Sequence, residues 1–454
     1  MLIEVSFSLK EFASLAGIGY SGEDLLIDSI STDSREIGKN TLFAALRGEK
    51  SDGNLFVPNA IAGGAVACLC GENAGCSVPF LPTIDAMASL IRAAKSHTNA
   101  IRPKKIAVTG SVGKTTTKEL IFSALDAAYR TRKSESNYNT LTGVVLTMLA
   151  MPRDTQAVVC EMGMSARGEI SAMSKVFEPD IAVITNIGSS HLESLGTREN
   201  IARAKCEILD GMGENGRLVY HGDEPLLRAG EGSFPKGSVS FGFGETNGVS
   251  AGNIVSSGEK TTFTLLDGKS EKRDFTIPLS GRFHVLDALA AFAAASLAGV
   301  SEKEIREGFL SYRSVGMRQR MTVRNGIRII EDCYNASPES MLSSLENLRT
   351  AAGEGRKAAF LGDMLELGRD SDALHRKVGR YAAENGVSLL FSFGERAKAI
   401  ARSASDAGVP EIYVFSENEM EEAVKTVREK CREGDTLLVK GSRGMRLERL
   451  TENL

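Results

Sequence analysis

The sequence predicts an α/β protein of three domains, with parallel sheets in at least two of them. The chain has 454 residues, which at roughly 150 residues a domain leaves room for three. Short apolar runs without polar alternation, which are typical of strands buried on both faces of a parallel sheet, alternate with helical segments. Hydrophobic residues make up 42% of the chain and charged residues 25%, as in ordinary globular proteins.

Charge and hydropathy exclude several classes of protein. Lys and Arg number 54 against 58 Asp and Glu, and a net charge of −4 argues against nucleic-acid binding. The chain has no run of 18 apolar residues, so no membrane span is predicted, and its first residues lack the pattern of a signal peptide. Seven dispersed cysteines indicate reduced thiols, and no later Cys/His pair completes a zinc site with Cys68, Cys70 and Cys76. We expect a cytoplasmic monomer.

The first domain is expected over residues 1–100. It mixes short strands and helices, as at residues 40–46, and the Asp52-Gly53 pair is typical of a turn. A helix predicted over residues 86–97 leads to Arg102-Pro103, which we interpret as a linker.

The second domain is expected over residues 101–315, as a central parallel sheet. It opens with a strand at 105–109, a Gly-rich turn and a helix at about 115–129. Apolar runs at 157–160 and 181–184 predict further buried strands. Residues 260–266 and 275–279 predict a hairpin, with a turn at Asp267-Gly268. An Ala-rich helix at 285–298 ends at Gly299.

The third domain is expected over residues 316–454. Asn325-Gly326 between two apolar segments is the strongest short-range signal of a hairpin. Strands predicted at 358–361, 389–393, 412–415 and 436–439 then alternate with helical segments. This pattern predicts a doubly wound, Rossmann-like sheet.

A phosphate-binding loop, or P-loop, lies between the first strand of the central domain and its helix. Glycines allow backbone amides to approach phosphate, the helix start attracts anions, and a lysine reaches the outer phosphates. A threonine hydroxyl after that lysine can bind Mg²⁺. Val108 stands where the strict motif has Gly, so the match is to a shorter variant. The loop residues are Gly110, Ser111, Val112, Gly113, Lys114, Thr115 and Thr116.

Two polar residues follow neighbouring buried strands and are candidate metal ligands. Glu161 ends the strand at 157–160, and His191 follows the strand that ends near Thr185, together with Asn186. Ligands collect at the carboxyl ends of parallel strands, so both could hold a divalent cation near the nucleotide. The pattern leaves open that His191 is instead a loop histidine with its hydrogen bonds satisfied.

Lys205 lies on the apolar face of a predicted helix. Its neighbours on that face are Ile201, Ala204, Ile208 and Leu209, at helical spacing. A desolvated lysine loses its proton more easily, and a neutral amine can take up CO₂ to form a carbamate that ligates Mg²⁺. From the pattern alone, a lysine whose ammonium group reaches water is the commoner arrangement.

These motifs together resemble those of the Mur ligases, ATP-dependent amide-forming enzymes of peptidoglycan precursor synthesis. The resemblance spans nearly the whole chain. The central-domain set comprises TGSVGKTT at 109–116, EMG at 161–163, TNI at 185–187 with His191, and AK at 204–205. In the third domain, EDCYNASPESM at 331–341, LGDMLELG at 361–368 and VKGSR at 439–443 resemble the member that adds D-alanyl-D-alanine. In the first, STDSR at 31–35 and residues 42–53 resemble a UDP-binding domain.

The resemblance implies substrates, cofactors and roles. The substrates would be UDP-N-acetylmuramoyl-tripeptide and D-alanyl-D-alanine, joined through an acyl phosphate formed from ATP. Thr115 and Glu161 would serve one Mg²⁺, and His191 and a carbamylated Lys205 a second. Asn139 would contact the acyl substrate. Arg318 and Asp332 would contact the nucleotide from the third domain.

Some positions depart from the family pattern, and other functions stay open. Asn54 stands where His is frequent, and Thr140 and Val145 stand where Asn and Pro are usual, which affects the substrate contacts and not the P-loop. The alternatives are another ligase of the family, a nucleotide switch with the same loop, and a binding protein without catalysis. The sequence does not distinguish diaminopimelate from lysine as the third residue of the tripeptide.

Overall fold

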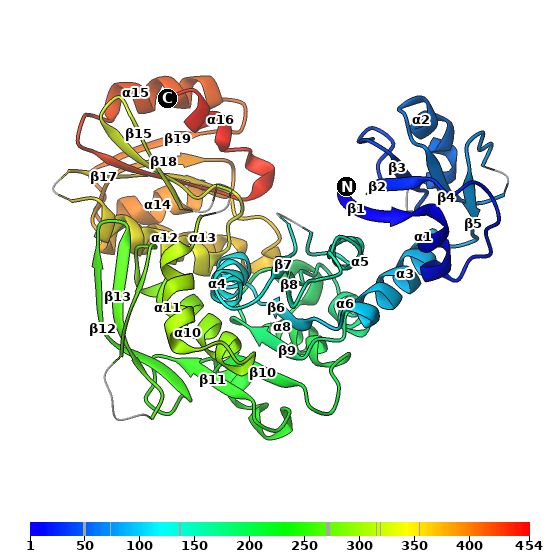
Figure 1. Ribbon diagram of the computed structural model, residues 1–454. Coiled ribbons are helices and arrows are strands. Elements are labelled where there is room, and N and C mark those ends of the chain that lie inside the picture. Colours follow the sequence, from blue (N-terminus) through cyan, green and yellow to red (C-terminus); the bar gives the residue numbers. More distant parts are fainter. Residues whose placement is uncertain are drawn as a thin grey trace.

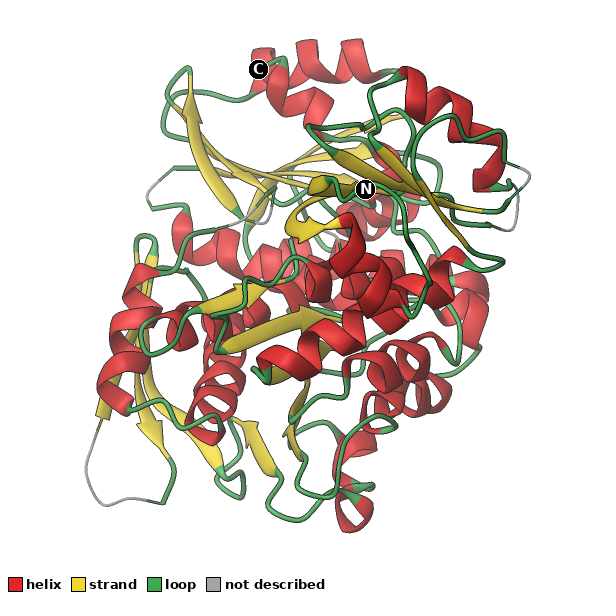
Figure 2. Cartoon of the chain, turned by 45° about the vertical axis from the view of Figure 1, so that its right-hand side comes forward, coloured by secondary structure: helices red, strands yellow, loops and turns green. Residues whose placement is uncertain are grey.

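The computed structural model describes residues 1–48, 51–72, 74–135, 138–268, 273–314, 316–317, 319–353 and 355–454. It has three sheets of five, nine and six strands, each with helices packed against it (Figures 1 and 2). In Figure 1 the N-terminal domain lies to the right, and the C-terminal domain lies above the central one on the left. The predicted α/β architecture of three domains is confirmed.

The N-terminal sheet has the strand order β1-β2-β3-β4-β5. β1 pairs antiparallel with β2, and the other pairs are parallel. The strands are β1 (Leu2–Ser8), β2 (Leu26–Ser31), β3 (Thr41–Ala44), β4 (Ala67–Cys70) and β5 (Phe80–Pro82). The helices are α1 (Leu9–Ala16), α2 (Val57–Ala62) and α3 (Ala86–Ile101). α3 runs to the central domain and ends at Arg102, which has left-handed backbone (φ 57°) directly before Pro103.

The central sheet has the order β14-β13-β12-β11-β10-β9-β6-β8-β7. All pairs from β7 to β12 along this order are parallel, while β13 pairs antiparallel with β12 and β14. The strands are β6 (Lys104–Thr109), β7 (Thr131–Lys133), β8 (Ala157–Glu161), β9 (Ile181–Ile184), β10 (Arg217–His221), β11 (Val239–Gly242), β12 (Val249–Ser257), β13 (Lys260–Leu266) and β14 (Arg273–Ile277). The strands at 157–160 and 181–184 and the hairpin were all predicted, whereas β12 was not. The expected turn residues Asp267 and Gly268 follow β13, and Gly268 has φ 78°.

Helices of the central domain cover the sheet and form two layers of buried apolar side chains with it. One layer packs α4 and α10 against β6, β8 and β9, and includes the fully buried Leu120, Leu289 and Phe263. The predicted Ala-rich helix is α10, and Gly299 follows it with φ 88°. The helices are α4 (Lys114–Asp126), α5 (Leu141–Leu149), α6 (Glu169–Phe177), α7 (Leu192–Leu195), α8 (Arg198–Cys206), α9 (Pro225–Arg228), α10 (Arg282–Leu297) and α11 (Glu302–Ser311).

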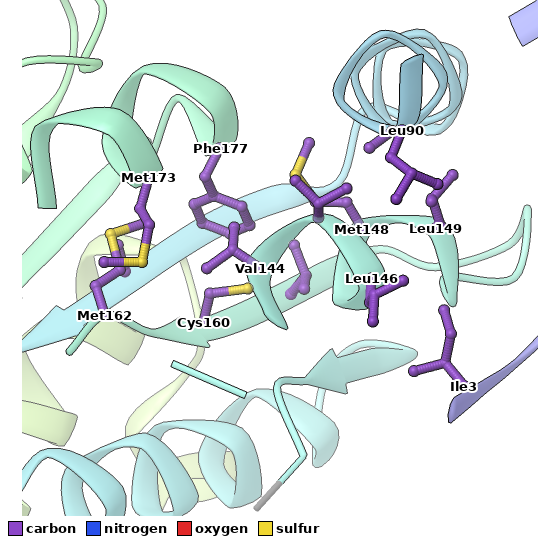
Figure 3. Packing of buried hydrophobic residues seen from close by; sticks show 14 of the residues in the cluster. Ile3, Leu90, Val144, Leu146, Met148, Leu149, Cys160, Met162, Met173 and Phe177 are labelled. Carbon is purple, nitrogen blue, oxygen red and sulfur yellow. The ribbon is translucent and has the colours of Figure 1, made fainter. Parts of the chain in front are cut away.

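The second layer joins the central domain to the N-terminal one. Leu90 of α3 and Ile3 of β1 lie close to Leu146 and Leu149 of α5 (Figure 3). On the other side of α5, Val144 lies near Cys160 of β8. The apolar core is therefore continuous from β1 through α5 to the central sheet, which fixes the N-terminal domain on one flank of the central domain.

The C-terminal sheet has the order β15-β16-β20-β17-β18-β19, with only β15 antiparallel. Asn325 and Gly326 have φ values of 50° and 74° between β15 and β16, so the predicted hairpin is confirmed. The four later strands were also predicted. The strands are β15 (Arg320–Arg324), β16 (Ile327–Glu331), β17 (Lys357–Gly362), β18 (Val387–Phe393), β19 (Glu411–Phe415) and β20 (Thr436–Lys440), with helices α12 (Pro338–Ala351), α13 (Ser371–Glu384), α14 (Lys398–Asp406), α15 (Met420–Lys430) and α16 (Glu448–Glu452).

The structure also bears on the expectations about membrane spans and cysteines. Among the described residues, no helix is long and apolar enough to cross a membrane. All seven cysteines are free thiols, as expected from their dispersed spacing.

Candidate active site

The P-loop joins β6 to α4 through glycines at two positions that exclude a side chain. Gly110 has φ 152° and Gly113 has φ 82°. A Cβ atom at Gly110 would overlap Thr185 Oγ1, and one at Gly113 would overlap Asp287 Oδ1. The loop therefore packs closely against the end of β9 on one side and against α10 on the other, and its backbone amides stay near the surface of the sheet.

Asn186, directly after β9, holds the loop in place. Its Oδ1 accepts hydrogen bonds from the backbone N–H groups of Ser111 (3.1 Å) and Val112 (2.9 Å), and its Nδ2 donates to Val112 O (3.0 Å). Thr185 Oγ1 donates to the same carbonyl at 2.6 Å. Neighbouring parallel strands thus supply both the loop and the side chains that shape it.

Lys114 begins α4 and folds back along the loop. Its Nζ donates to Gly110 O at 2.8 Å and to Ser111 O at 3.3 Å. This places a positive charge at the start of a helix, among backbone amides. Such an arrangement favours anionic phosphate groups.

Glu161 lies beside the P-loop and joins two of the predicted site residues. Thr115 Oγ1 donates to Glu161 Oε2 at 2.6 Å, and Asn139 Nδ2 donates to Glu161 Oε1 at 3.2 Å. Glu161 is only 2% exposed. Hydroxyl and carboxylate oxygens are the ligands that Mg²⁺ prefers, so Thr115 and Glu161 form an oxygen donor pair suited to it.

Lys205 is buried inside α8, with only 2% of its surface exposed. Its ammonium group does not reach water, in contrast to the commoner arrangement that the bare pattern favoured. Burial and the nearby charge of Lys114 hold the pKa of Lys205 well below its usual range. Among the described residues no carboxylate pairs with it. These surroundings favour the neutral amine.

His191 precedes α7 with left-handed backbone (φ 65°) and contacts the C-terminal domain. Its Nδ1 lies 2.7 Å from Oε2 of Glu366, a residue of the loop after β17. Burial lowers the pKa of His191, Glu366 opposes this shift, and the charges of Lys114 and Lys205 add to it. Among the described residues, no three His, Cys, Asp or Glu side chains gather as a metal cluster.

Asp332 brings a buried charge pair to the site from the C-terminal domain. It is 8% exposed and follows β16. Lys440 Nζ donates to Asp332 Oδ2 at 2.8 Å, and Ser344 Oγ donates to the same oxygen at 2.5 Å. Arg318, the other residue expected to reach the nucleotide from this side, lies outside the described residues.

A cavity of about 1210 Å³ lies between the central and C-terminal domains, and the described residues that line it do not include Thr115 or Lys205. Its lining includes P-loop residues 111–114, Glu161 and His191 of the central domain, and Asp332, Lys440 and Arg443 of the C-terminal domain. Met87 of α3 also lines it. The cavity therefore opens toward all three domains, and a ligand on the P-loop would meet groups from the C-terminal domain.

Several polar residues that line this cavity were not predicted from the sequence. His284 Nδ1 contacts Asp287 Oδ2 (3.2 Å), and Asp287 Oδ1 accepts from Thr117 of α4 (3.0 Å). Burial alone would lower the pKa of His284, but Asp287 raises it overall. Both residues lie in α10, but only Asp287 falls within the predicted helix at 285–298, where a carboxylate in an Ala-rich stretch was the available signal. Glu339 also went unnoticed, although it lies in the quoted segment 331–341.

Glu339 is a contact between the two larger domains. It lies in the first turn of α12, and its Oε1 accepts from Ser189 N (2.9 Å) and Ser189 Oγ (2.8 Å) in the loop after β9. That loop also contacts the P-loop, because Gly188 N donates to Ser111 Oγ at 2.8 Å. The C-terminal domain is thus hydrogen-bonded to the support of the phosphate loop.

This geometry defines a nucleotide-binding α/β protein in which a phosphate loop faces a second α/β domain. Comparison with known proteins then gives the family. Residues 26–110 match the Mur ligase family catalytic domain, residues 108–295 the Mur ligase middle domain, and residues 317–443 the Mur ligase glutamate ligase domain. The chain belongs to the Mur ligase family.

The similar proteins point to one branch of that family. The UDP-N-acetylmuramoyl-tripeptide–D-alanyl-D-alanine ligase of Bacillus subtilis is 37% identical over 440 residues, covering 95% of this chain and 94% of that protein. A crystal structure of MurF from Acinetobacter baumannii has a TM-score of 0.87 at 27% identity, with 99% of each chain covered. The MurF ligase of Thermotoga maritima, solved in complex with ADP, has a TM-score of 0.80 at 28% identity, covering 93% of this chain and 96% of that one.

Proposed function

We propose that this enzyme joins D-alanyl-D-alanine to UDP-N-acetylmuramoyl-tripeptide at the expense of ATP, in peptidoglycan precursor synthesis. The observation that carries the proposal is the single cavity lined by the P-loop and by the C-terminal domain. The similarity to ligases of this activity extends over nearly the full chain, at up to 37% identity among the relatives compared. The enzyme would work as a monomer in the cytoplasm, where its seven free thiols stay reduced.

The reaction would proceed in two steps. The terminal carboxylate of the tripeptide attacks the γ-phosphorus of ATP, which forms an acyl phosphate and releases ADP. The amine of D-alanyl-D-alanine then attacks the acyl carbon, which forms the amide and releases phosphate. Lys114 and the P-loop amides bind the phosphates and offset the charge that the approaching carboxylate adds. Asn139, bonded to Glu161 beside the loop, would contact the acyl substrate.

Magnesium would offset negative charge on the phosphates during the first step. Thr115 and Glu161 fit one ion, because their oxygens already lie 2.6 Å apart at the foot of the P-loop. His191 and Lys205 would hold a second. Mg²⁺ retains waters and takes ligands from substrate phosphates, so a site with few protein carboxylates suits it.

Carbamylation would make Lys205 a ligand. The buried amine has no anionic partner among the described residues, and the charge of Lys114 helps to hold its pKa low. CO₂ addition converts this neutral amine into an anion that Lys114 would stabilise. The carbamate would therefore place a negative charge on a side chain whose electrostatic surroundings include Lys114.

The C-terminal domain would protect the acyl phosphate from water. Asp332 and Lys440 line the cavity opposite the P-loop, and Glu339 joins the two domains at Ser189. Excluding water matters because an acyl phosphate hydrolyses readily. With water excluded, a positioned amine reacts with the acyl carbon before water does. Asp332, and Arg318 of the same domain, would approach the nucleotide.

Phosphate release tests the proposal directly. The assay contains Mg²⁺-ATP, UDP-N-acetylmuramoyl-tripeptide and D-alanyl-D-alanine, and each is omitted in turn. Release that needs all three, with a pentapeptide product, is the expected result. Release without the dipeptide would indicate an ATPase or another amine acceptor. No release in any combination would favour a binding protein or a switch. Tripeptides ending in diaminopimelate or lysine, assayed side by side, identify the third residue.

A further inference from the structure

We propose that Glu366 is a positioning residue which, from the C-terminal domain, holds His191 in the tautomer that can bind Mg²⁺. The proposal rests on the proposed function, because it takes His191 as a magnesium ligand. It adds a role for the C-terminal domain in completing a metal site whose other groups belong to the central domain.

The contact between Glu366 and His191 fixes the position of a proton. Glu366 Oε2 lies 2.7 Å from His191 Nδ1, and an ionised carboxylate can only accept a hydrogen bond. Nδ1 of the neutral imidazole therefore carries the proton. The lone pair is then on Nε2, the nitrogen through which the ring can bind a metal ion. Carboxylates that bond the second nitrogen of a metal-binding histidine orient the ring in this way.

Both residues have unusual backbone conformations, which indicates that their surroundings impose them. His191 has φ 65° and Glu366 has φ 64°, in the left-handed region that residues other than glycine adopt infrequently. The backbone N–H of Glu193, in α7 directly after His191, donates to Glu366 O at 3.2 Å, which is a second link between these two segments. On the C-terminal side, Leu365 N donates to Ser442 Oγ at 2.9 Å. Backbone hydrogen bonds therefore hold the segments that carry His191 and Glu366 in place.

The contact between Glu366 and His191 is exposed and weak, so it is better suited to orient the imidazole ring than to hold the two domains together. The Glu366 side chain is 63% exposed and that of His191 is 24% exposed, so solvent weakens their electrostatic attraction. The more buried Glu339–Ser189 contact is better placed to hold the domains together. Loss of Glu366 should therefore alter the tautomer of His191 and its affinity for metal, and leave the fold intact.

The tautomer can be read directly in the full-length protein. The chain has five histidines, so ¹⁵N-histidine labelling gives a simple long-range ¹H–¹⁵N spectrum, and a His191→Gln variant assigns the residue. At pH 8, above the usual pKa of histidine, the proton is expected on Nδ1 in the wild type because Glu366 accepts from that nitrogen. In Glu366→Ala the signals should shift toward the Nε2-protonated form. Glu366→Gln retains a carbonyl acceptor and should keep the Nδ1 proton.

A second measurement follows magnesium without turnover. Binding of a non-hydrolysable fluorescent ATP analogue is titrated with Mg²⁺, and Glu366→Ala should need about 10-fold more of the ion, at the lower end of the usual effect of such partners. Glu193→Ala is the matched control, because it removes an exposed carboxylate from the same segment as His191 and retains the backbone N–H. It should leave both the tautomer and the magnesium midpoint unchanged.

Three results would overturn the role of Glu366. They are an Nε2-protonated His191 in the wild type, an unchanged tautomer and magnesium midpoint in Glu366→Ala, and equal effects of Glu193→Ala. None of these depends on the ligation assay. If the wild type makes no pentapeptide, the proposed function fails. If the wild type is active and Glu366→Ala behaves like it in both measurements, only the positioning role fails.

Discussion

Lys205 decides whether the proposed magnesium site carries a carbamate. Its amine is 2% exposed and lies near Lys114, without a carboxylate partner among the described residues. We expect wild-type protein in ¹³C-bicarbonate to give a carbamate carbon resonance that is absent from Lys205→Arg, because a guanidinium stays protonated. Ligation should fall about 100-fold in that variant. Lys175→Arg, an exposed lysine of α6, is the control. A resonance that persists in Lys205→Arg would contradict the assignment.

Lys440 tests how much the buried charge pair of the C-terminal domain matters to stability. It is 2% exposed, and its ammonium group lies 2.8 Å from Asp332 Oδ2. Replacing it by methionine keeps the volume and leaves a buried carboxylate unpaired, which should cost about 3–5 kcal/mol. Calorimetric unfolding measures the loss. The double variant Lys440→Met with Asp332→Leu should recover much of it, and equal losses in both variants would contradict this account.

Single residues also show where sequence reasoning stops. Helical spacing placed Lys205 on an apolar face, yet only the packing around α8 shows that its ammonium group stays inside. His191 was left between a ligand and a satisfied loop residue, because its partner Glu366 is far away in the sequence. In contrast, the P-loop was recognisable because its residues are consecutive. Contacts between distant segments leave no local pattern.

At the scale of elements, the turn from β6 into α4 depends on Gly113. Its φ of 82° costs an alanine about 1–2 kcal/mol, and the added Cβ would also overlap Asp287 Oδ1. Gly113→Ala should therefore displace the loop and weaken ATP binding at least about tenfold. Gly168 precedes α6 with φ 88° and open space around its Cβ position, so Gly168→Ala incurs only the backbone cost. Its ATP affinity, measured by the same fluorescence titration, should match the wild type.

The elements differ in how readily the sequence revealed them. The strand at 181–184 is a fully buried apolar run, and the β15–β16 hairpin has Asn-Gly at its turn, so both have local causes. β12 was missed because its sequence mixes Gly, Ser and Asn with few apolar residues. It forms because β11 and β13 lie on either side and pair with it. Tertiary pairing there outweighs a weak local preference.

At the scale of the whole molecule, the domains are joined in two different ways. The N-terminal domain shares an apolar core with the central one through α3 and α5 (Figure 3). The C-terminal domain meets the central domain at the loop after β9 through polar contacts, those of Glu339 and Glu366. Apolar burial is hard to separate without unfolding, whereas a few hydrogen bonds exchange readily with water. The C-terminal domain is therefore the one suited to open and close.

Removing Glu339 should uncouple phosphate release from ligation. Its carboxylate accepts two hydrogen bonds from Ser189, and without them the C-terminal domain should dock less often over the P-loop. An acyl phosphate exposed to water hydrolyses, so Glu339→Ala should release more phosphate than it forms pentapeptide, with ligation down about tenfold. Both products are quantified in one reaction. Glu384→Ala, at the exposed end of α13 in the same domain, should keep a ratio of one phosphate per pentapeptide, as expected for the wild type. If Glu339→Ala kept that ratio as well, docking through Ser189 would not be what protects the intermediate.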